Sequence, residues 1–100
     1  MLLRPEQRAI LAHLARRYIW WQPPERSLDH PHRLLAQVMN IGDWHDVQGM
    51  CAAMEPEELR QVLAEAQPGE FNRRSWNFWH LRLGLPHGED LPELPRRTFG

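Results

Sequence analysis

The sequence contains no lysine, so all 12 of its basic residues are arginine. Its single cysteine, Cys51, excludes an internal disulfide framework and a cysteine-rich zinc site, and favours a reducing compartment. No apolar run approaches the roughly 18 residues that a membrane span requires. The first residues also lack the long apolar stretch of a secretory signal. We therefore expect a cytoplasmic protein that does not enter a membrane.

Charge is nearly balanced, with 12 Arg against 13 acidic residues and a formal net charge of −1. Exclusive use of arginine has two readings: a bias in coding composition, or selection for bidentate contacts with carboxylate or phosphate. Nucleic-acid-binding domains are usually clearly basic, so the net charge favours the first reading. Residues 55–70 carry five Glu and one Arg, whereas residues 71–84 carry three Arg and no acid. We expect these adjacent segments to pair within one fold.

Residues 71–85 form the most aromatic stretch of the chain, with two of its five Trp and two of its three Phe. Their apolar side chains recur at helical spacing, and Gly84 followed by Pro86 is typical of a helix end. So large an apolar face must be covered by other helices, and we predict that this is the central helix of the domain. The predicted apolar stripe comprises Phe71, Trp76, Phe78, Trp79, Leu83 and Leu85.

Four more amphipathic segments precede it, three of which begin near a proline that suits the first helical position. Residues 22–30 are predicted to be a polar connector. Gly49 within the third segment costs up to about 1 kcal/mol relative to Ala, and close packing of a neighbouring helix would explain it. The predicted helices run over residues 5–21, 31–42, 43–54 and 55–67, with Asp43 as an N-cap.

These patterns predict a single compact all-α domain of about five short helices in orthogonal packing. The helical domain spans residues 1–85. Residues 86–100 contain further prolines and little apolar periodicity, so we predict an extended or disordered tail.

No recognised catalytic pattern is present. Cys51 lies on an apolar stripe with Met50 and Met54, where a buried thiol is expected. Ser27 and Ser75 lack a nucleophile-elbow motif, and phosphate-binding and dinucleotide motifs are absent. The glutamates with the right chemistry for acid–base catalysis lie on an ordinary solvated helix face, and we expect no enzymatic activity and no cofactor. Those glutamates are Glu57, Glu58, Glu65 and Glu70.

Asp29, His30 and His32 are the densest group of potential metal ligands. No second His or Cys pair at helical spacing completes such a site, so no metal is expected. The six histidines are instead predicted to lie on the surface.

The five tryptophans divide into two groups. We assign Trp44, Trp76 and Trp79 to the core. Trp20 and Trp21 are adjacent and cannot both lie on one face of a helix, so at least one is expected to be exposed. Trp, Tyr and Arg dominate protein-interface hot spots, which makes this region a candidate partner-binding surface. The predicted partner-binding residues are Arg16, Arg17, Tyr18, Trp20 and Trp21.

Arg73 and Arg74 begin the aromatic helix and could contact phosphate, which would make them a nucleic-acid site. The competing reading, which we favour, is that they pair with Glu58 or Glu65 inside the fold.

Three segments carry a family resemblance: Trp20-Trp21, residues 38–47 (VMNIGDWHDV), and residues 74–79 (RSWNFW) with Gly84. Across about residues 20–85 they resemble a small uncharacterised bacterial helical domain often encoded beside AbiEii-type nucleotidyltransferase toxins. The resemblance implies an antitoxin-like or accessory partner of such a toxin. That family has no established active site, so it assigns no catalytic residue here. Asn40 departs from the pattern, which has more charge before the Gly.

We therefore expect a non-enzymatic protein-interaction module. The alternative is a DNA-binding regulator in which Gly42 and Asp43 form the turn of a helix-turn-helix. Against it, the polar face of the following helix offers Asp46 and Gln48 but no Arg to reach phosphate. A homodimer with a purely structural role is a third possibility.

Overall fold

The computed structural model describes residues 2–97, and within that range the chain forms helices and no β-strand. The predicted all-α fold is thereby confirmed. Asp43 and Asn72 cap two of the helices by accepting 2.8 Å hydrogen bonds from the backbone N–H groups of Asp46 and Ser75. The elements are α1 (Pro5–Tyr18), α2 (Pro24–Leu28), α3 (Pro31–Ile41), α4 (Trp44–Ala53), α5 (Pro56–Ala64), α6 (Arg73–Arg82) and the 3-10 helix η1 (Gly88–Asp90).

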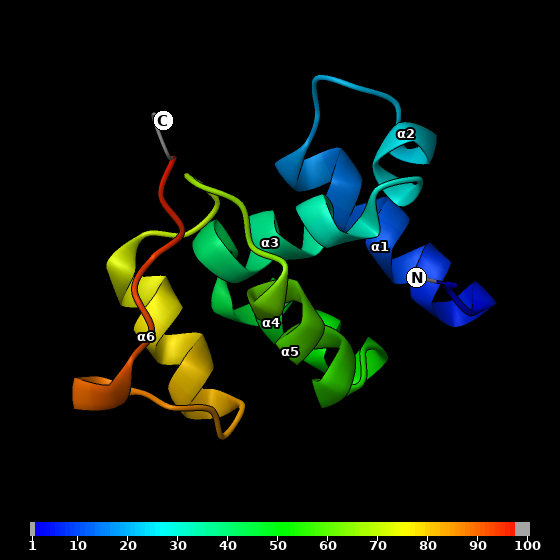
Figure 1. Cartoon of the computed structure of the whole chain (residues 1–100). Helices are drawn as coiled ribbons and strands as arrows, with labels where there is room; N and C mark the ends of the chain where they lie inside the picture. Colours follow the sequence, from blue (N-terminus) through cyan, green and yellow to red (C-terminus); the bar gives the residue numbers. More distant parts are fainter. Residues whose placement is uncertain (1, 98–100) are drawn as a thin grey trace.

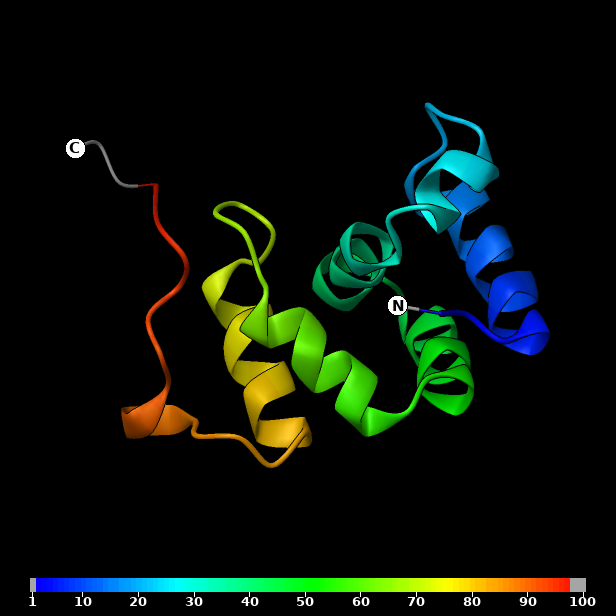
Figure 2. The same cartoon turned by 45° about the vertical axis from the view of Figure 1, so that its right-hand side comes forward.

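Helix α3 is the centre of the fold, because it packs against each of the other α-helices (Figures 1 and 2). The prediction that the aromatic helix is central is wrong: α6 packs chiefly against α3 and lies at one side of the molecule. The physical reason is how much of each helix is covered. Three consecutive residues of α3, Leu34, Leu35 and Ala36, are buried together with Val38, so α3 is enclosed around most of its circumference.

Helix α6 buries Trp76, Trp79 and His80, whereas Phe78 is 41% exposed. Both buried indoles donate 2.7 Å hydrogen bonds, from Trp79 Nε1 to the Met39 carbonyl and from Trp76 Nε1 to the Pro92 carbonyl. The buried face therefore centres on these indoles, and the placement of Phe78 in the apolar stripe is wrong.

His80 corrects the prediction that the histidines lie on the surface. Its ring packs against Trp76 with 4.4 Å between ring centres, and its Nδ1 lies 2.7 Å from the carbonyl oxygen of the same residue. A carbonyl accepts hydrogen bonds, so Nδ1 donates this one, and the buried His80 ring has a partner within its own helix.

Trp44 is 56% exposed, so its assignment to the core is wrong, while the assignments of Trp76 and Trp79 are confirmed. Trp44 is the first residue of α4, and that helix buries Val47 and Met50 instead. Gly49 was expected to allow a close approach by a neighbouring helix. This is also wrong, since no heavy atom lies within 4 Å of the position a Cβ would take.

The connector predicted over residues 22–30 contains α2, a helix too short to show periodicity. Pro24 occupies its first position, and the side chain of its buried residue Ser27 accepts a 2.9 Å hydrogen bond from Gln22 Nε2. Helix α1 ends at Tyr18, three residues earlier than predicted, because Ile19 leaves the helical conformation and is buried.

Residues 86–97 are largely extended, as predicted, and they contact the helices. Leu91 and Leu94 pack partly buried against the core, and the Gly88 N–H donates a 3.1 Å hydrogen bond to Asn77 Oδ1. Gly84 has a φ of 72°, the left-handed conformation expected at the end of α6. The rest of the predicted tail, residues 98–100, lies outside the described residues.

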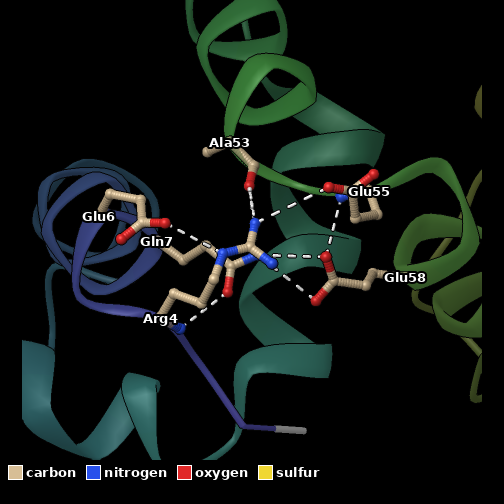
Figure 3. A network of polar contacts seen from close by, with 6 residues as sticks. All are labelled: Arg4, Glu6, Gln7, Ala53, Glu55 and Glu58. Carbon is tan, nitrogen blue, oxygen red and sulfur yellow. Dashed lines mark hydrogen bonds and ion pairs between the residues drawn. The ribbon is translucent and has the colours of Figure 1, made fainter.

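A buried glutamine joins three helices near the start of the chain (Figure 3). Gln7 is fully buried, its Oε1 accepts from the Arg4 N–H at 2.9 Å, and its Nε2 donates to the Ala53 carbonyl at 3.2 Å and to Glu58 Oε1 at 3.1 Å. It therefore links α1 to the end of α4 and the first turn of α5. Within residues 2–97, no helix combines the length and apolar character needed to cross a membrane.

Candidate functional site

Trp20 and Trp21 are both exposed, at 74% and 61%, on the loop between α1 and α2. Their rings meet edge to face, with 5.9 Å between centres and 83° between planes. The expectation that at least one is exposed is confirmed. We call residues 19–23 the tryptophan loop.

The tryptophan loop is held at both ends. Ile19 is 4% exposed and its N–H donates to the Ala15 carbonyl at 2.9 Å. At the other end, the Gln22 side chain is tied to Ser27 and Pro23 leads directly into α2. The two indoles are thus presented on an anchored backbone, so a partner would pay little to order them.

Leaving two indole rings largely exposed to water is unfavourable in free energy. Each Trp side chain offers roughly 150–250 Å² of surface, and burying the exposed part at about 25 cal/mol per Å² is worth on the order of 3 kcal/mol per ring. An exposed apolar patch of this kind marks an interaction site more often than isolated surface residues do.

A groove of about 1110 Å³ opens beside the tryptophan loop, with Ile19 and Trp21 in its lining. One wall comes from α2 and the start of α3, and the other from α5 and the loop that follows it. The walls differ in charge. Arg26 and Arg33 line the first, and within residues 2–97 neither forms an ion pair. The second is lined by Glu57, Glu58, Glu65 and Glu70.

His32 connects the two walls. Its Nε2 lies 3.2 Å from Glu70 Oε1, and its Nδ1 lies 3.6 Å from Glu65 Oε2. Asp29 and His30, considered above as its partners in a metal site, are exposed. Within the described residues no group of three or more His, Cys, Asp or Glu side chains is arranged to hold a metal ion.

Two of the predicted partner-binding residues are engaged inside the fold. The Tyr18 hydroxyl donates to Asp46 Oδ2 at 2.6 Å and accepts from the Asp43 N–H at 3.0 Å. Arg17 pairs with the same two carboxylates, at 2.9 Å to Asp43 and 3.2 Å to Asp46. Burial raises the pKa of Tyr18, and its hydrogen bond to Asp46 raises it further.

The structure therefore separates the predicted set. Trp20 and Trp21 are free, and Trp21 lines the groove. Arg16 is exposed one helical turn before them and, among residues 2–97, forms no ion pair. The remaining two, Arg17 and Tyr18, join the end of α1 to the start of α4.

Arg73 and Arg74 are exposed in the first turn of α6. The expectation that they pair with Glu58 or Glu65 is wrong, because Glu58 is bonded to Gln7 and Glu65 lies with Gln61 and His32. More generally, no ion pair of the described residues joins the acidic segment 55–70 to the basic segment 71–84.

The groove has no signature in the sequence. Its basic wall and its acidic wall come from segments about thirty residues apart, and no spacing rule connects them. Comparison with known protein families, with curated proteins and with solved structures gives no match for this chain.

Proposed function

We propose that this chain is a non-enzymatic protein-binding module that holds a segment of a partner protein in the groove beside Trp20 and Trp21. The observation that carries the proposal is the pair of exposed indoles on a loop anchored at both ends, at the edge of that groove. Tryptophan is among the residues most enriched at interface hot spots, and an anchored loop lowers the cost of binding.

The groove has room for a segment of polypeptide, with a volume of about 1110 Å³. Arg26 and Arg33 face the acidic wall across it, so a segment carrying both signs of charge can complement both walls. The tryptophans then bind apolar side chains of the segment, and the charged walls fix its position along the groove.

The family resemblance supplies a candidate for the partner. It covers the tryptophan loop through α6, and it implies an antitoxin-like or accessory role beside an AbiEii-type nucleotidyltransferase. We include that enzyme class in the proposal as the first partner to test.

Binding of DNA through α4 is the weaker proposal. Asp43 places an exposed carboxylate at the N-cap of that helix, where a recognition helix would approach the phosphates. Asp46, expected on its polar face, is buried and bonded to Tyr18. The exposed residues of α4 include no arginine; they are Trp44, His45, Gln48 and Ala52. An electrophoretic shift assay with a salt titration separates the two proposals, since phosphate-driven binding weakens steeply with salt.

The test is native co-purification of the tagged full chain from its host, with bound proteins identified by mass spectrometry. We expect a stoichiometric protein partner that is lost when Trp20→Ala and Trp21→Ala are combined. Leu2→Ala is the matched control, because Leu2 is another exposed apolar side chain, far along the chain from the tryptophan loop. Recovery of the chain alone, or with DNA only, would overturn the proposal.

A further inference from the structure

Helix α6 lies well apart from the tryptophan loop in both views (Figures 1 and 2), and a second set of exposed apolar side chains lies on it and beside it. Phe78 and Leu81 of α6 are 41% and 54% exposed, and Ile41 and Trp44, at the junction of α3 and α4, are 55% and 56% exposed. We call these four residues the α6 face.

Contacts hold the junction of α3 and α4, which carries Ile41 and Trp44, beside α6. The guanidinium carbon of Arg82 lies 5.5 Å from the ring centre of Trp44, so the start of α4 is beside the last turn of α6. Asn40, next to Ile41, accepts hydrogen bonds from the Asn72 N–H at 2.9 Å and from Ser75 Oγ at 3.0 Å. The end of α3 is therefore held against the first turn of α6.

The unpaired charge on α6 is positive, and the exposed Asp43 between Ile41 and Trp44 is paired with Arg17 at 2.9 Å. Arg74 and Arg82 lie four residues before and after Phe78, so helical spacing places all three on the outer side of α6. Residues 71–84 contain no acidic residue, and within residues 2–97 neither arginine forms an ion pair.

This charge pattern limits what can cover the surface. A second copy docked symmetrically through α6 would bring arginines against arginines, which is unfavourable. Nucleic acid would satisfy the arginines and could stack on Phe78 and Trp44, but the whole chain has a net charge of −1, whereas nucleic-acid-binding domains are usually clearly basic. The α6 face, with an apolar centre and basic flanks, is complementary to a partner surface that has an apolar stripe and acidic flanks.

We infer that the α6 face binds an amphipathic helix of a partner protein, with acidic residues on both sides of its apolar stripe. This surface is separate from the groove, so the chain can hold two polypeptide segments at once. A module of this kind links two proteins, or grips one partner at two places. With two simultaneous contacts, overall affinity exceeds that of either contact alone.

The probe is a synthetic amphipathic helix of about 18 residues with a leucine stripe flanked by glutamates. A second peptide has lysine in place of every glutamate. We expect the acidic peptide to bind the full chain at least about ten-fold more tightly than the basic one. In nitrogen-15 labelled chain it should shift the amide signals of residues 41–45 and 74–82.

Two variants test the residues. Combining Phe78→Ser with Leu81→Ser should weaken binding of the acidic peptide at least about ten-fold while the chain stays folded, with a modest fall in melting temperature from the lost edge-to-face contact between Phe78 and Trp79. Replacing Arg74 with Glu should reduce the preference for the acidic peptide, and an acidic residue in the first turn of a helix preserves its stability. The Trp20→Ala, Trp21→Ala variant should bind the peptide normally, which separates this inference from the proposed function.

The inference is overturned if both peptides bind equally, or if the shifted signals map elsewhere. It is also overturned if the Phe78→Ser, Leu81→Ser variant abolishes self-association in sedimentation, or if it abolishes binding of a single-stranded oligonucleotide while peptide binding persists. Those results would assign the surface to a second copy of the chain or to nucleic acid.

Discussion

The Tyr18 hydroxyl donates a 2.6 Å hydrogen bond to Asp46 Oδ2 while accepting one of 3.0 Å from the backbone N–H of Asp43. One phenol thus holds both the N-cap of α4 and a buried carboxylate one turn further on. Because Tyr18 is the last residue of α1, this contact also fixes where the tryptophan loop begins. Tyr18 therefore contributes both to the stability of the fold and to the position of the tryptophan loop.

Replacing Tyr18 with Phe should lower the free energy of unfolding by about 1–3 kcal/mol, since Asp46 and the Asp43 N–H each lose a partner. The ion pair between Arg17 and Asp46 remains in this variant and limits the loss of stability. Urea denaturation measures the change. Trp21→Phe serves as the control and should lie within about 0.5 kcal/mol of the wild type, because that side chain is exposed. Equal stability of the Tyr18→Phe variant and the wild type would contradict this role.

The same contact predicts a dependence on alkaline pH. Burial, followed by the hydrogen bond to Asp46, raises the pKa of Tyr18 above its ordinary value of about 10. The folded chain then keeps a proton that the unfolded chain loses, so this stabilisation is complete below about pH 10 and declines as pH rises further. Urea unfolding between about pH 9 and 11 should show a steeper loss for the wild type than for Tyr18→Phe. An equal loss of stability with pH in the two proteins would argue against a raised pKa of Tyr18.

Gln7→Leu should destabilise the fold by about 1–3 kcal/mol, because it removes the partner of the Arg4 N–H and of the Ala53 carbonyl. Gln7→Glu should cost more, since it places a second carboxylate beside Glu58. The exposed Gln61 provides a matched control, and Gln61→Leu should change stability by no more than about 0.5 kcal/mol. Thermal and urea unfolding of the three variants would rank them, and any other order speaks against the network in Figure 3.

Gly49→Ala should stabilise the chain by about 0.4–1 kcal/mol, because the added methyl group meets no neighbour and alanine favours a helix. Gly42→Ala is the contrasting variant. A Cβ there would lie 2.5 Å from the Val38 carbonyl oxygen, so the backbone must shift and stability should fall. Melting temperatures that move in the same direction for both variants would contradict this reading.

The sequence predicted those features that depend on local chemistry. The Asp43 cap, the prolines that open α3 and α5, and the left-handed Gly84 all follow from residues within one turn of the feature. Exposure of at least one of the adjacent tryptophans was predicted because neighbouring residues cannot share one face of a helix. Both are exposed because α1 ends at Tyr18 and leaves them on a loop.

Features that depend on distant segments were not predictable. An aromatic helix such as α6 offers two apolar sides, and only the position of α3 decides that Trp79 is buried while Phe78 is exposed. The burial of His80 depends on packing against Trp76 in the same way. The groove needs α5 to face α2 across α3, which no local pattern encodes.

The most direct test of the account measures the affinity of the co-purified partner for the full chain by calorimetry, in the wild type and in the Trp20→Ala, Trp21→Ala variant. Thermal unfolding of both establishes that the variant is folded, as the exposure of both rings predicts. The account predicts an unchanged melting temperature and an affinity at least about ten-fold weaker, because an interface tryptophan commonly contributes about 2 kcal/mol or more. An affinity within about two-fold of the wild type would contradict the claim that the tryptophan loop binds the partner.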